Sequence, residues 1–253
     1  MNIVASIKRS LSILALAAAS FAAPAHAELF QDFTVNLNGR TITADKMVMG
    51  YQEILTIDSA STFKTSAFAA MPVFWANEAS RAVAADMNVY AIFTATGQVV
   101  DNGGKFVGTS GSIALYLDQG DITELTLPGV GGDAVTVTNG NTDVLLASTD
   151  NFRFGSGSLR PGSINDANGD FSLTFNDLML TTAGASYFTS PVPFYTQLTI
   201  DGNFSSTEPI NLNGTSSLIS GAANVFFVPE PSAVALFGIA LLGLGMSRRR
   251  RCA

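Results

Sequence analysis

The feature that most restricts the fold of this chain is an alternation of apolar and polar side chains in short segments. It is clearest in residues 33–37 (FTVNL), 113–117 (IALYL) and 171–176 (FSLTFN). Successive side chains of a β-strand point to opposite faces, so this period is typical of strands with one buried face. The side chains that the pattern assigns to the core are Phe33, Val35, Leu37, Leu115, Leu117, Leu173, Phe175, Leu198 and Ile200.

Turn-forming dipeptides separate many of these segments. Asn-Gly and Asp-Gly accept the positive φ values that tight hairpins require. Short strands with a turn every ten residues or so predict an all-β fold, a single antiparallel β-sandwich or jelly roll over residues 28–228. The Ala-rich residues 78–87 are either a helix or a loop that crosses one end of the sandwich. The dipeptides are Asn38-Gly39, Asn139-Gly140, Asp201-Gly202 and Asn213-Gly214.

The start of the chain has the pattern of a secretory signal peptide. Two basic residues precede an apolar run over residues 11–23, and Ala25 and Ala27 then form an A-x-A cleavage site. We therefore predict that the Sec machinery exports the chain and that residues 1–27, a signal helix, are removed. The mature protein then begins at Glu28.

The end of the chain, residues 229–253, has three parts in a fixed order. Pro229, Glu230 and Pro231 form a stiff entry that excludes helix, because proline fixes φ and lacks an N–H donor. Residues 233–246 are apolar, and an apolar segment that ends in arginines predicts a transmembrane helix whose basic end stays in the cytoplasm. The run is at the short end of the usual length of roughly 20 residues. The arginines are Arg248, Arg249, Arg250 and Arg251.

This three-part tail resembles a PEP-CTERM sorting signal. The resemblance implies recognition and processing by an exosortase, a membrane-embedded cysteine transpeptidase, in a Gram-negative cell that makes extracellular polysaccharide. It also implies export across the inner membrane, transient retention by the C-terminal helix, and a final location at the cell surface or in the extracellular matrix. A plain C-terminal anchor that stays attached is the alternative.

Removal of both ends changes the chemistry that the chain has available. The only histidine, His26, lies in the signal peptide, and the only cysteine, Cys252, lies beyond the arginines. The body between them therefore lacks disulfides, Ser-His-Asp or Cys-His catalysis, and zinc sites built on His or Cys. Residues 28–230 carry seven basic and twenty acidic side chains, a formal net charge of −13. This charge disfavours partners such as nucleic acid or anionic lipid.

Several stretches of the body resemble the flocculation-associated branch of PEP-CTERM proteins. The resemblance implies an extracellular, non-enzymatic protein that helps cells aggregate into flocs or biofilm with a secreted polysaccharide as partner. The alternatives are a carbohydrate-binding module and a secreted hydrolase, which would need a cleft with two carboxylates. The matching stretches are residues 43–46, 50–53, 89–93, 111–118, 193–195 and 225–231.

Two groups of side chains in the body are candidate ligand contacts. Asp166, Asn168 and Asp170 place oxygen donors at alternating positions, as a calcium loop does, so Ca²⁺ is the one cofactor considered. The other interpretation is a plain turn before a strand, since Phe171 occupies the position where an EF-hand loop needs glycine. Five aromatic residues form either a sugar-stacking surface or part of the core: Tyr51, Phe74, Trp75, Tyr187 and Tyr195.

Overall fold

The computed structural model describes residues 31–37, 39–58, 61–76, 79–81, 87–160, 168–206, 210 and 214–229. Strands dominate this part of the chain, as the two-residue alternation predicted, and its one α-helix is α2 (Thr182–Tyr187). The predicted signal helix and the predicted transmembrane helix lie outside the described residues. Within the described ranges, no helix has both the length and the apolar character needed to span a membrane.

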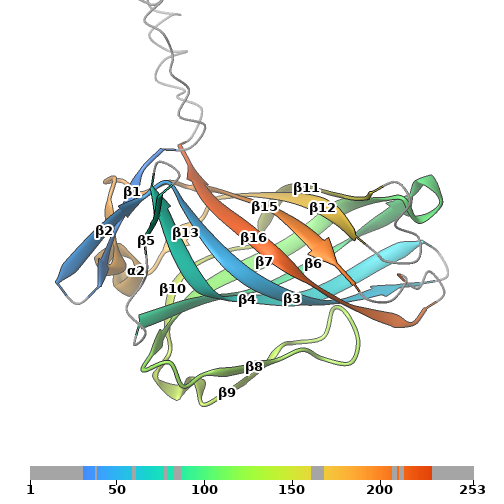
Figure 1. The fold of residues 1–253 in the computed structure, drawn as a ribbon, viewed down its shortest axis with the longest axis horizontal. Coiled ribbons are helices and arrows are strands. Elements are labelled where there is room, and N and C mark those ends of the chain that lie inside the picture. The colour runs from blue at the N-terminus through green and yellow to red at the C-terminus, as the bar shows by residue number, and fades with distance from the viewer. Residues whose placement is uncertain are drawn as a thin grey trace, which may run out of the picture. The chain divides into compact units, whose positions relative to one another are not determined.

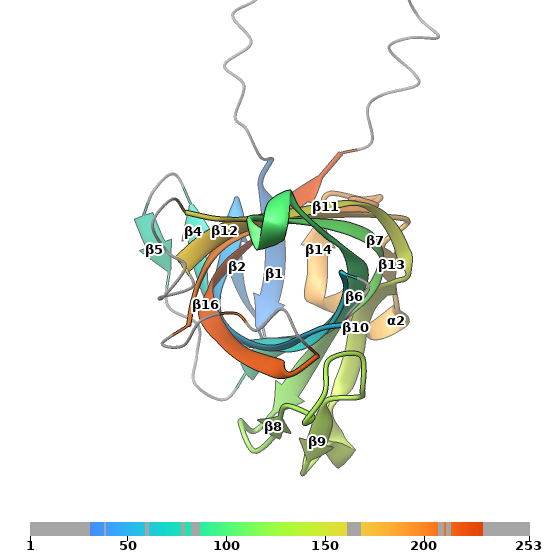
Figure 2. The same ribbon diagram turned by 90° about the vertical axis from the view of Figure 1, so that its right-hand side faces the viewer.

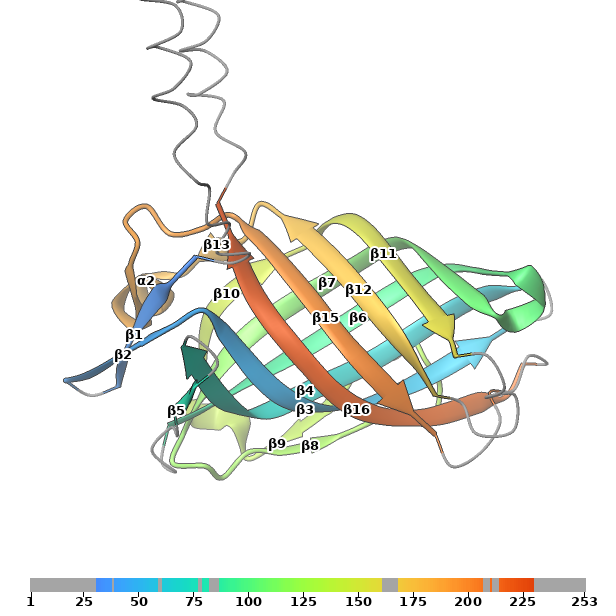
Figure 3. The same ribbon diagram turned by 45° about the horizontal axis from the view of Figure 1, so that its top comes forward.

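Eight strands close into one barrel-like sheet, which Figure 2 shows end-on and Figure 3 from the side. They are β3 (Lys46–Ile57), β4 (Thr62–Ala76), β6 (Met87–Val100), β7 (Lys105–Gln119), β11 (Asn151–Leu159), β12 (Asn168–Asn176), β15 (Gln197–Ser205) and β16 (Ser216–Val228). Each strand pairs antiparallel with the next in the order β3-β4-β6-β7-β11-β12-β15-β16, and β16 pairs with β3. The ring therefore has no free edge strand.

The remaining strands attach to this ring (Figure 1). β7 pairs with β11 through its first part and with β10 (Val144–Thr149) through its second, and β13 (Met179–Leu180) extends β10. β5 (Ala79–Arg81) pairs with β4, and β8 (Glu124–Thr126) pairs with β9 (Thr136–Thr138). A separate three-stranded sheet contains β1 (Phe33–Leu37), β2 (Arg40–Ala44) and β14 (Phe188–Ser190). Two short 3₁₀ turns complete the elements, η1 (Asp101–Gly103) and η2 (Gly140–Thr142).

The loop between β8 and β9 is fixed to the ring by a buried hydroxyl group. Ser66, on β4, donates a hydrogen bond to the carbonyl oxygen of Asp133 at 2.6 Å. The same hydroxyl accepts a hydrogen bond from the N–H of Gly132 at 2.9 Å. Gly131 lies against the backbone of β3 and β4, where an added Cβ would meet the carbonyl oxygen of Lys64 at 2.2 Å. Only a residue without a side chain permits this approach.

The all-β prediction is confirmed, whereas the predicted sandwich is corrected to a closed ring. Alternation along a strand is the same whether its apolar face meets a second sheet or the interior of a barrel, so the sequence period could not separate the two. Long strands coil strongly enough for one sheet to close on itself, and β4 and β7 have 15 residues each. Of the nine predicted core residues, all are buried except Leu173, which is partly buried.

The turn predictions had mixed outcomes. The Asn38-Gly39 hairpin is confirmed, because Gly39 has φ +90° and β1 pairs with β2 over its whole length. Asn139 has φ +60° and does form a turn, but β9 pairs with β8 and the strand after the turn pairs with β7. Gly214 has φ +84°, and Asn213 lies outside the described residues.

Two predictions about local structure were wrong. Asp201 and Gly202 lie within β15 instead of forming a turn. Gly202 is explained by crowding inside the ring, since an added Cβ would meet the ring of Phe171 and the carbonyl oxygen of Ala222 at 2.5 Å. The candidate helix over residues 78–87 is also corrected where it is described, because Ala79–Arg81 is strand β5 and β6 begins at Met87. Pairing with β4 overrides the helical propensity of alanine there.

Aromatic side chains meet at one end of the ring, the end beside β1, which lies on the left of Figure 1. The ring of Phe33 on β1 lies 5.0 Å from Phe227 on β16 and 6.2 Å from Phe74 on β4, measured between centroids. Phe188 and Phe194 lie 4.9 Å apart and 5.2 Å and 5.0 Å from Phe227. Edge-to-face contacts of this kind add to the stabilisation that burial provides. We call these five residues the aromatic cluster.

Candidate functional sites

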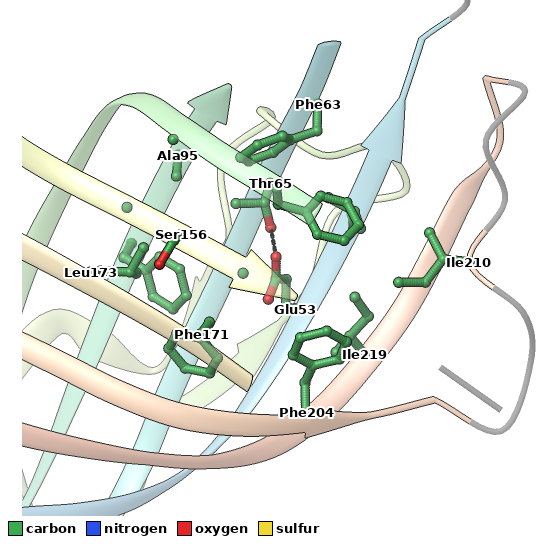
Figure 4. A pocket seen from close by; sticks show the side chains of 16 residues that line it. Glu53, Phe63, Thr65, Ala95, Ser156, Phe171, Leu173, Phe204, Ile210 and Ile219 are labelled. Atoms are coloured by element: carbon green, nitrogen blue, oxygen red, sulfur yellow. Dashed lines mark hydrogen bonds between the residues drawn. The ribbon is translucent and has the colours of Figure 1, made fainter. Parts of the chain in front are cut away.

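A charged side chain occupies an inward position on β3. Alternate residues of this strand point into the ring, and Met47, Met49, Tyr51, Leu55 and Ile57 are buried there. Glu53 stands in the same series, so its side chain also enters the interior (Figure 4). Glu53 is partly buried, so its carboxylate loses part of its hydration there, which favours a compensating interaction.

Glu53 lines an apolar cavity of about 70 Å³. The cavity lies near the start of β7 and β16, opposite the aromatic cluster, whose Phe227 stands near the end of β16. Apart from Glu53, Thr65 and Ser156, the residues around this cavity are apolar or glycine. A ring of eight strands is just wide enough either to be filled by side chains or to hold one small ligand. The residues that line it are Glu53, Leu55, Phe63, Thr65, Phe93, Ala95, Phe106, Gly108, Gly155, Ser156, Gly157, Phe171, Leu173, Phe204, Ile210 and Ile219.

Small residues explain why this end is not filled. Gly157 on β11 and Ala95 on β6 project little or no side chain into the interior. Phe171 and Leu173 on β12 occupy inward positions, yet both are only partly buried. Small residues on the surrounding strands therefore leave room for the cavity.

The carboxyl group of Glu53 has one hydrogen-bond partner among the described residues. Thr65, which is 3% exposed, donates through Oγ1 to Glu53 Oε1, and its Oγ1 also lies 3.1 Å from the carbonyl oxygen of Ile54. Burial raises the pKa of Glu53 from 4.5 to about 7, and the hydrogen bond from Thr65 opposes part of this rise. The cavity lining includes no basic side chain that could neutralise the carboxylate.

A second hollow lies on the outside of the ring, where β7 leaves β11 and pairs with β10. We call it the outer groove. Its lining is rich in uncharged polar groups, and Thr94 and Ser112 share a hydrogen bond of 3.0 Å. At its rim Asn151 Nδ2 donates to Asp177 Oδ2 at 2.5 Å, and Met179 is 71% exposed. The lining residues are Ile92, Phe93, Thr94, Ser112, Ile113, Ala114, Tyr116, Ser148, Thr149, Asp150, Asn151, Asp177 and Met179.

Only two of the three proposed calcium ligands lie in the described part of the chain. Asp170 lies in β12 and binds Arg160 through two hydrogen bonds, 2.6 Å to Nη2 and 3.1 Å to Nε. The bonds from Arg160 hold the pKa of Asp170 below its usual value. Asn168 begins β12, and Asp166 lies outside the described residues. Across the described ranges, no group of three or more acidic, histidine or cysteine side chains could hold a metal ion.

The aromatic residues considered for sugar stacking are mostly core residues. Tyr51, Phe74, Tyr187 and Tyr195 are buried, so they cannot form a stacking surface. Trp75 is partly buried, and Lys46 Nζ lies 5.5 Å from its ring centroid. The sequence analysis did not identify Glu53. The alternation along β3 could have shown its inward position, since Tyr51 and Leu55, two residues to either side, both point inward.

The last strand of the ring ends where the predicted sorting segment begins. Val228 is the final residue of β16 and pairs with Gln197, and Pro229 follows directly. The remaining predicted processing and topology residues lie outside the described residues; they are Ala25, Ala27, Glu230, Pro231, Arg248, Arg249, Arg250 and Arg251.

Comparison with known proteins agrees with this reading of the tail. Residues 227–251 match the family model described as a PEP-CTERM protein-sorting motif. No curated protein and no solved structure matches the chain. The chain thus carries a PEP-CTERM sorting motif, which indicates a secreted protein that an exosortase targets, exported across the inner membrane to the cell surface or beyond.

Proposed function

We propose that this protein is a non-enzymatic surface or matrix protein that promotes cell aggregation together with extracellular polysaccharide. In this proposal Ala25 and Ala27 direct removal of the signal peptide. Pro229, Glu230 and Pro231 form the segment that the exosortase engages. The four arginines, Arg248 to Arg251, hold the apolar tail in the inner membrane until that step.

The observation that carries the proposal is the position of the sorting motif relative to the ring. All eight strands of the ring lie before Pro229, and the last of them ends at Val228. Cleavage beyond Val228 would remove no strand and no ring of the aromatic cluster. Residues 28–230 carry a net charge of −13, and without the apolar tail such an acidic domain should stay dissolved outside the cell.

The outer groove supports a polysaccharide partner. Neutral sugars are bound through hydroxyl, amide and carboxylate groups combined with an apolar face on which a ring can rest. The groove combines hydroxyl groups from Thr94, Ser112 and Ser148 with Asn151 and the half-buried ring of Tyr116. The same features support the second candidate function, a carbohydrate-binding module without a role in aggregation.

The test separates aggregation from export. Cells that produce the double variant Asp150→Ala, Asn151→Ala should export the protein normally but form smaller flocs, because two exposed polar groups of the groove are lost. The control variant Glu124→Ala, Thr126→Ala changes exposed positions on β8, which does not line the groove, and should flocculate like the parent. Export is followed by immunoblotting, and floc size by light scattering.

The outcomes distinguish the two candidates. Loss of flocculation together with loss of binding to purified exopolysaccharide supports the aggregation role. Loss of polysaccharide binding with unchanged flocculation favours the carbohydrate-binding module instead. Unchanged behaviour of the groove variant in both assays would contradict a polysaccharide site in the outer groove.

A further inference from the structure

The cavity inside the ring is separate from the outer groove in position and in chemistry. It lies within the barrel-like sheet, and its surface is almost entirely apolar. A polysaccharide chain offers hydroxyl groups on every unit, and these would stay unsatisfied in such a space. The cavity therefore needs a different occupant, and the proposed aggregation role does not use it.

The size of the cavity admits a small organic molecule. By the measure in which one water molecule needs roughly 10–15 Å³, the cavity offers about 70 Å³. Empty apolar cavities of modest volume bind apolar molecules readily, since the ligand restores the van der Waals contacts that the void lacks. Phe63, Phe171 and Phe204 present ring surfaces to this space (Figure 4).

Glu53 determines the polar part of the ligand. Thr65 satisfies one carboxyl oxygen, while the other carboxyl oxygen has no hydrogen-bond donor among the described residues. A carboxylate in an apolar space gains most from a cation that also donates hydrogen bonds. Because no basic side chain lines the cavity, a ligand is the available source of that charge.

The net negative charge of the body also favours a cationic ligand. Residues 28–230 carry a net charge of −13, which attracts small cations and repels carboxylate ligands such as fatty acids. We infer that the cavity binds a small apolar amine, with its ammonium group on Glu53 and its hydrocarbon part against the phenylalanine rings.

Amine binding in the cavity should depend on pH through the titration of Glu53. Tyr51 is the titratable neighbour of Glu53 on its own strand. The cavity residues of β4, β6, β7, β11, β12, β15 and β16 are apolar side chains, glycines, Thr65 and Ser156, none of which titrates near neutrality. Glu53 is therefore the group that controls binding, and amine affinity should fall as the pH decreases through about 7, where its carboxylate takes up a proton.

The experiment compares three ligands that share one alkyl chain and differ in the head group. Hexylamine is a cation near neutral pH, 1-hexanol is neutral, and hexanoate is an anion. The protein is purified as the cells export it, and binding is measured by calorimetry and ligand-observed NMR at about pH 8, where Glu53 is ionised. We expect hexylamine to bind at least roughly tenfold more tightly than 1-hexanol, and hexanoate not to bind.

Two variants assign the binding to the cavity. Glu53→Gln keeps the shape of the side chain and should bind hexylamine no better than 1-hexanol. Ala95→Leu fills part of the cavity and should weaken both ligands. The matched control is Glu124→Gln, which removes the same charge from an exposed position on β8 and should bind like the parent.

Each outcome decides the inference. Equal binding of hexylamine and hexanoate by the parent protein, or no binding of hexylamine, would overturn it without any variant. Retention of the amine preference in Glu53→Gln would overturn the role of the carboxylate. If Glu53→Gln does not fold, the ligand series on the parent and its pH dependence still decide.

Discussion

The two ends of the ring are filled differently. At one end, five phenylalanines from β1, β4, β14, β16 and the segment after β14 meet with centroid distances of 4.9–6.3 Å. At the other end, Ala95 and Gly157 leave space for a cavity, and Glu53 enters it. A protein interior is normally packed as densely as an organic crystal. The aromatic end therefore stabilises the fold through its packing, whereas the other end keeps a cavity.

The first strand and the last strand of the described chain meet at the aromatic end. β1, the first described strand, and the end of β16 lie side by side (Figure 3), and Phe33 of β1 contacts Phe227 of β16 in the aromatic cluster. We expect the tight packing there to keep the ring closed when the segment after Val228 is processed.

The largest expected effect is the difference between two Phe→Ala substitutions. Phe227 is fully buried and contacts three rings, so Phe227→Ala should lower the free energy of unfolding by about 3–5 kcal/mol. Phe171 is partly buried and contacts the ring of Tyr51 at 5.2 Å, so Phe171→Ala should cost only about 1–2 kcal/mol. Urea unfolding of both variants measures the contrast, and equal costs would contradict it.

The second prediction concerns Glu53 and pH. Because folding raises the pKa of Glu53 from 4.5 to about 7, the folded state binds its proton more tightly than the unfolded state. Its contribution to stability is fully present below about pH 4.5 and is lost as the pH rises to about 7, a change of about 3 kcal/mol.

Glu53→Gln removes this titration while keeping the hydrogen bond from Thr65. Relative to the parent, the variant should therefore be more stable at about pH 8 and should gain nothing at about pH 4. Thermal unfolding at a series of pH values makes the comparison, with Glu124→Gln as the exposed control. A parent and a Glu53→Gln variant with parallel profiles would show that Glu53 titrates normally.

The smallest effects come from two tyrosine hydroxyl groups. The hydroxyl of Tyr51, beside the cavity, is buried with no hydrogen-bond partner in the described part of the chain. Tyr51→Phe should leave stability unchanged or raise it by up to about 1 kcal/mol. Tyr195, at the aromatic end, donates to the carbonyl oxygen of Asp32 at 2.8 Å, so Tyr195→Phe should lower stability by about 1 kcal/mol. Effects of the same sign would contradict the contrast between the ends.

Much of the aromatic end could be predicted from the sequence, and little of the cavity end. Phe33, Val35 and Leu37 alternate with polar residues and are followed by Asn-Gly, so strand, face and turn are all local properties. The cavity depends on residues such as Ala95, Gly155 and Glu53, which lie far apart in the chain and meet only when the ring closes. Closure itself depends on the pairing of β7 with β11, which no local pattern reveals.

The measurement that tests the account most directly is the intact mass and C-terminal sequence of the protein recovered outside the cell. Because β16 pairs with β15 up to Val228 and Phe227 completes the aromatic cluster, the processed chain should end after Val228 and lack the four arginines. An exported product that ends at or before Phe227, or that keeps Arg248 to Arg251, would contradict the proposal that processing leaves the closed ring whole.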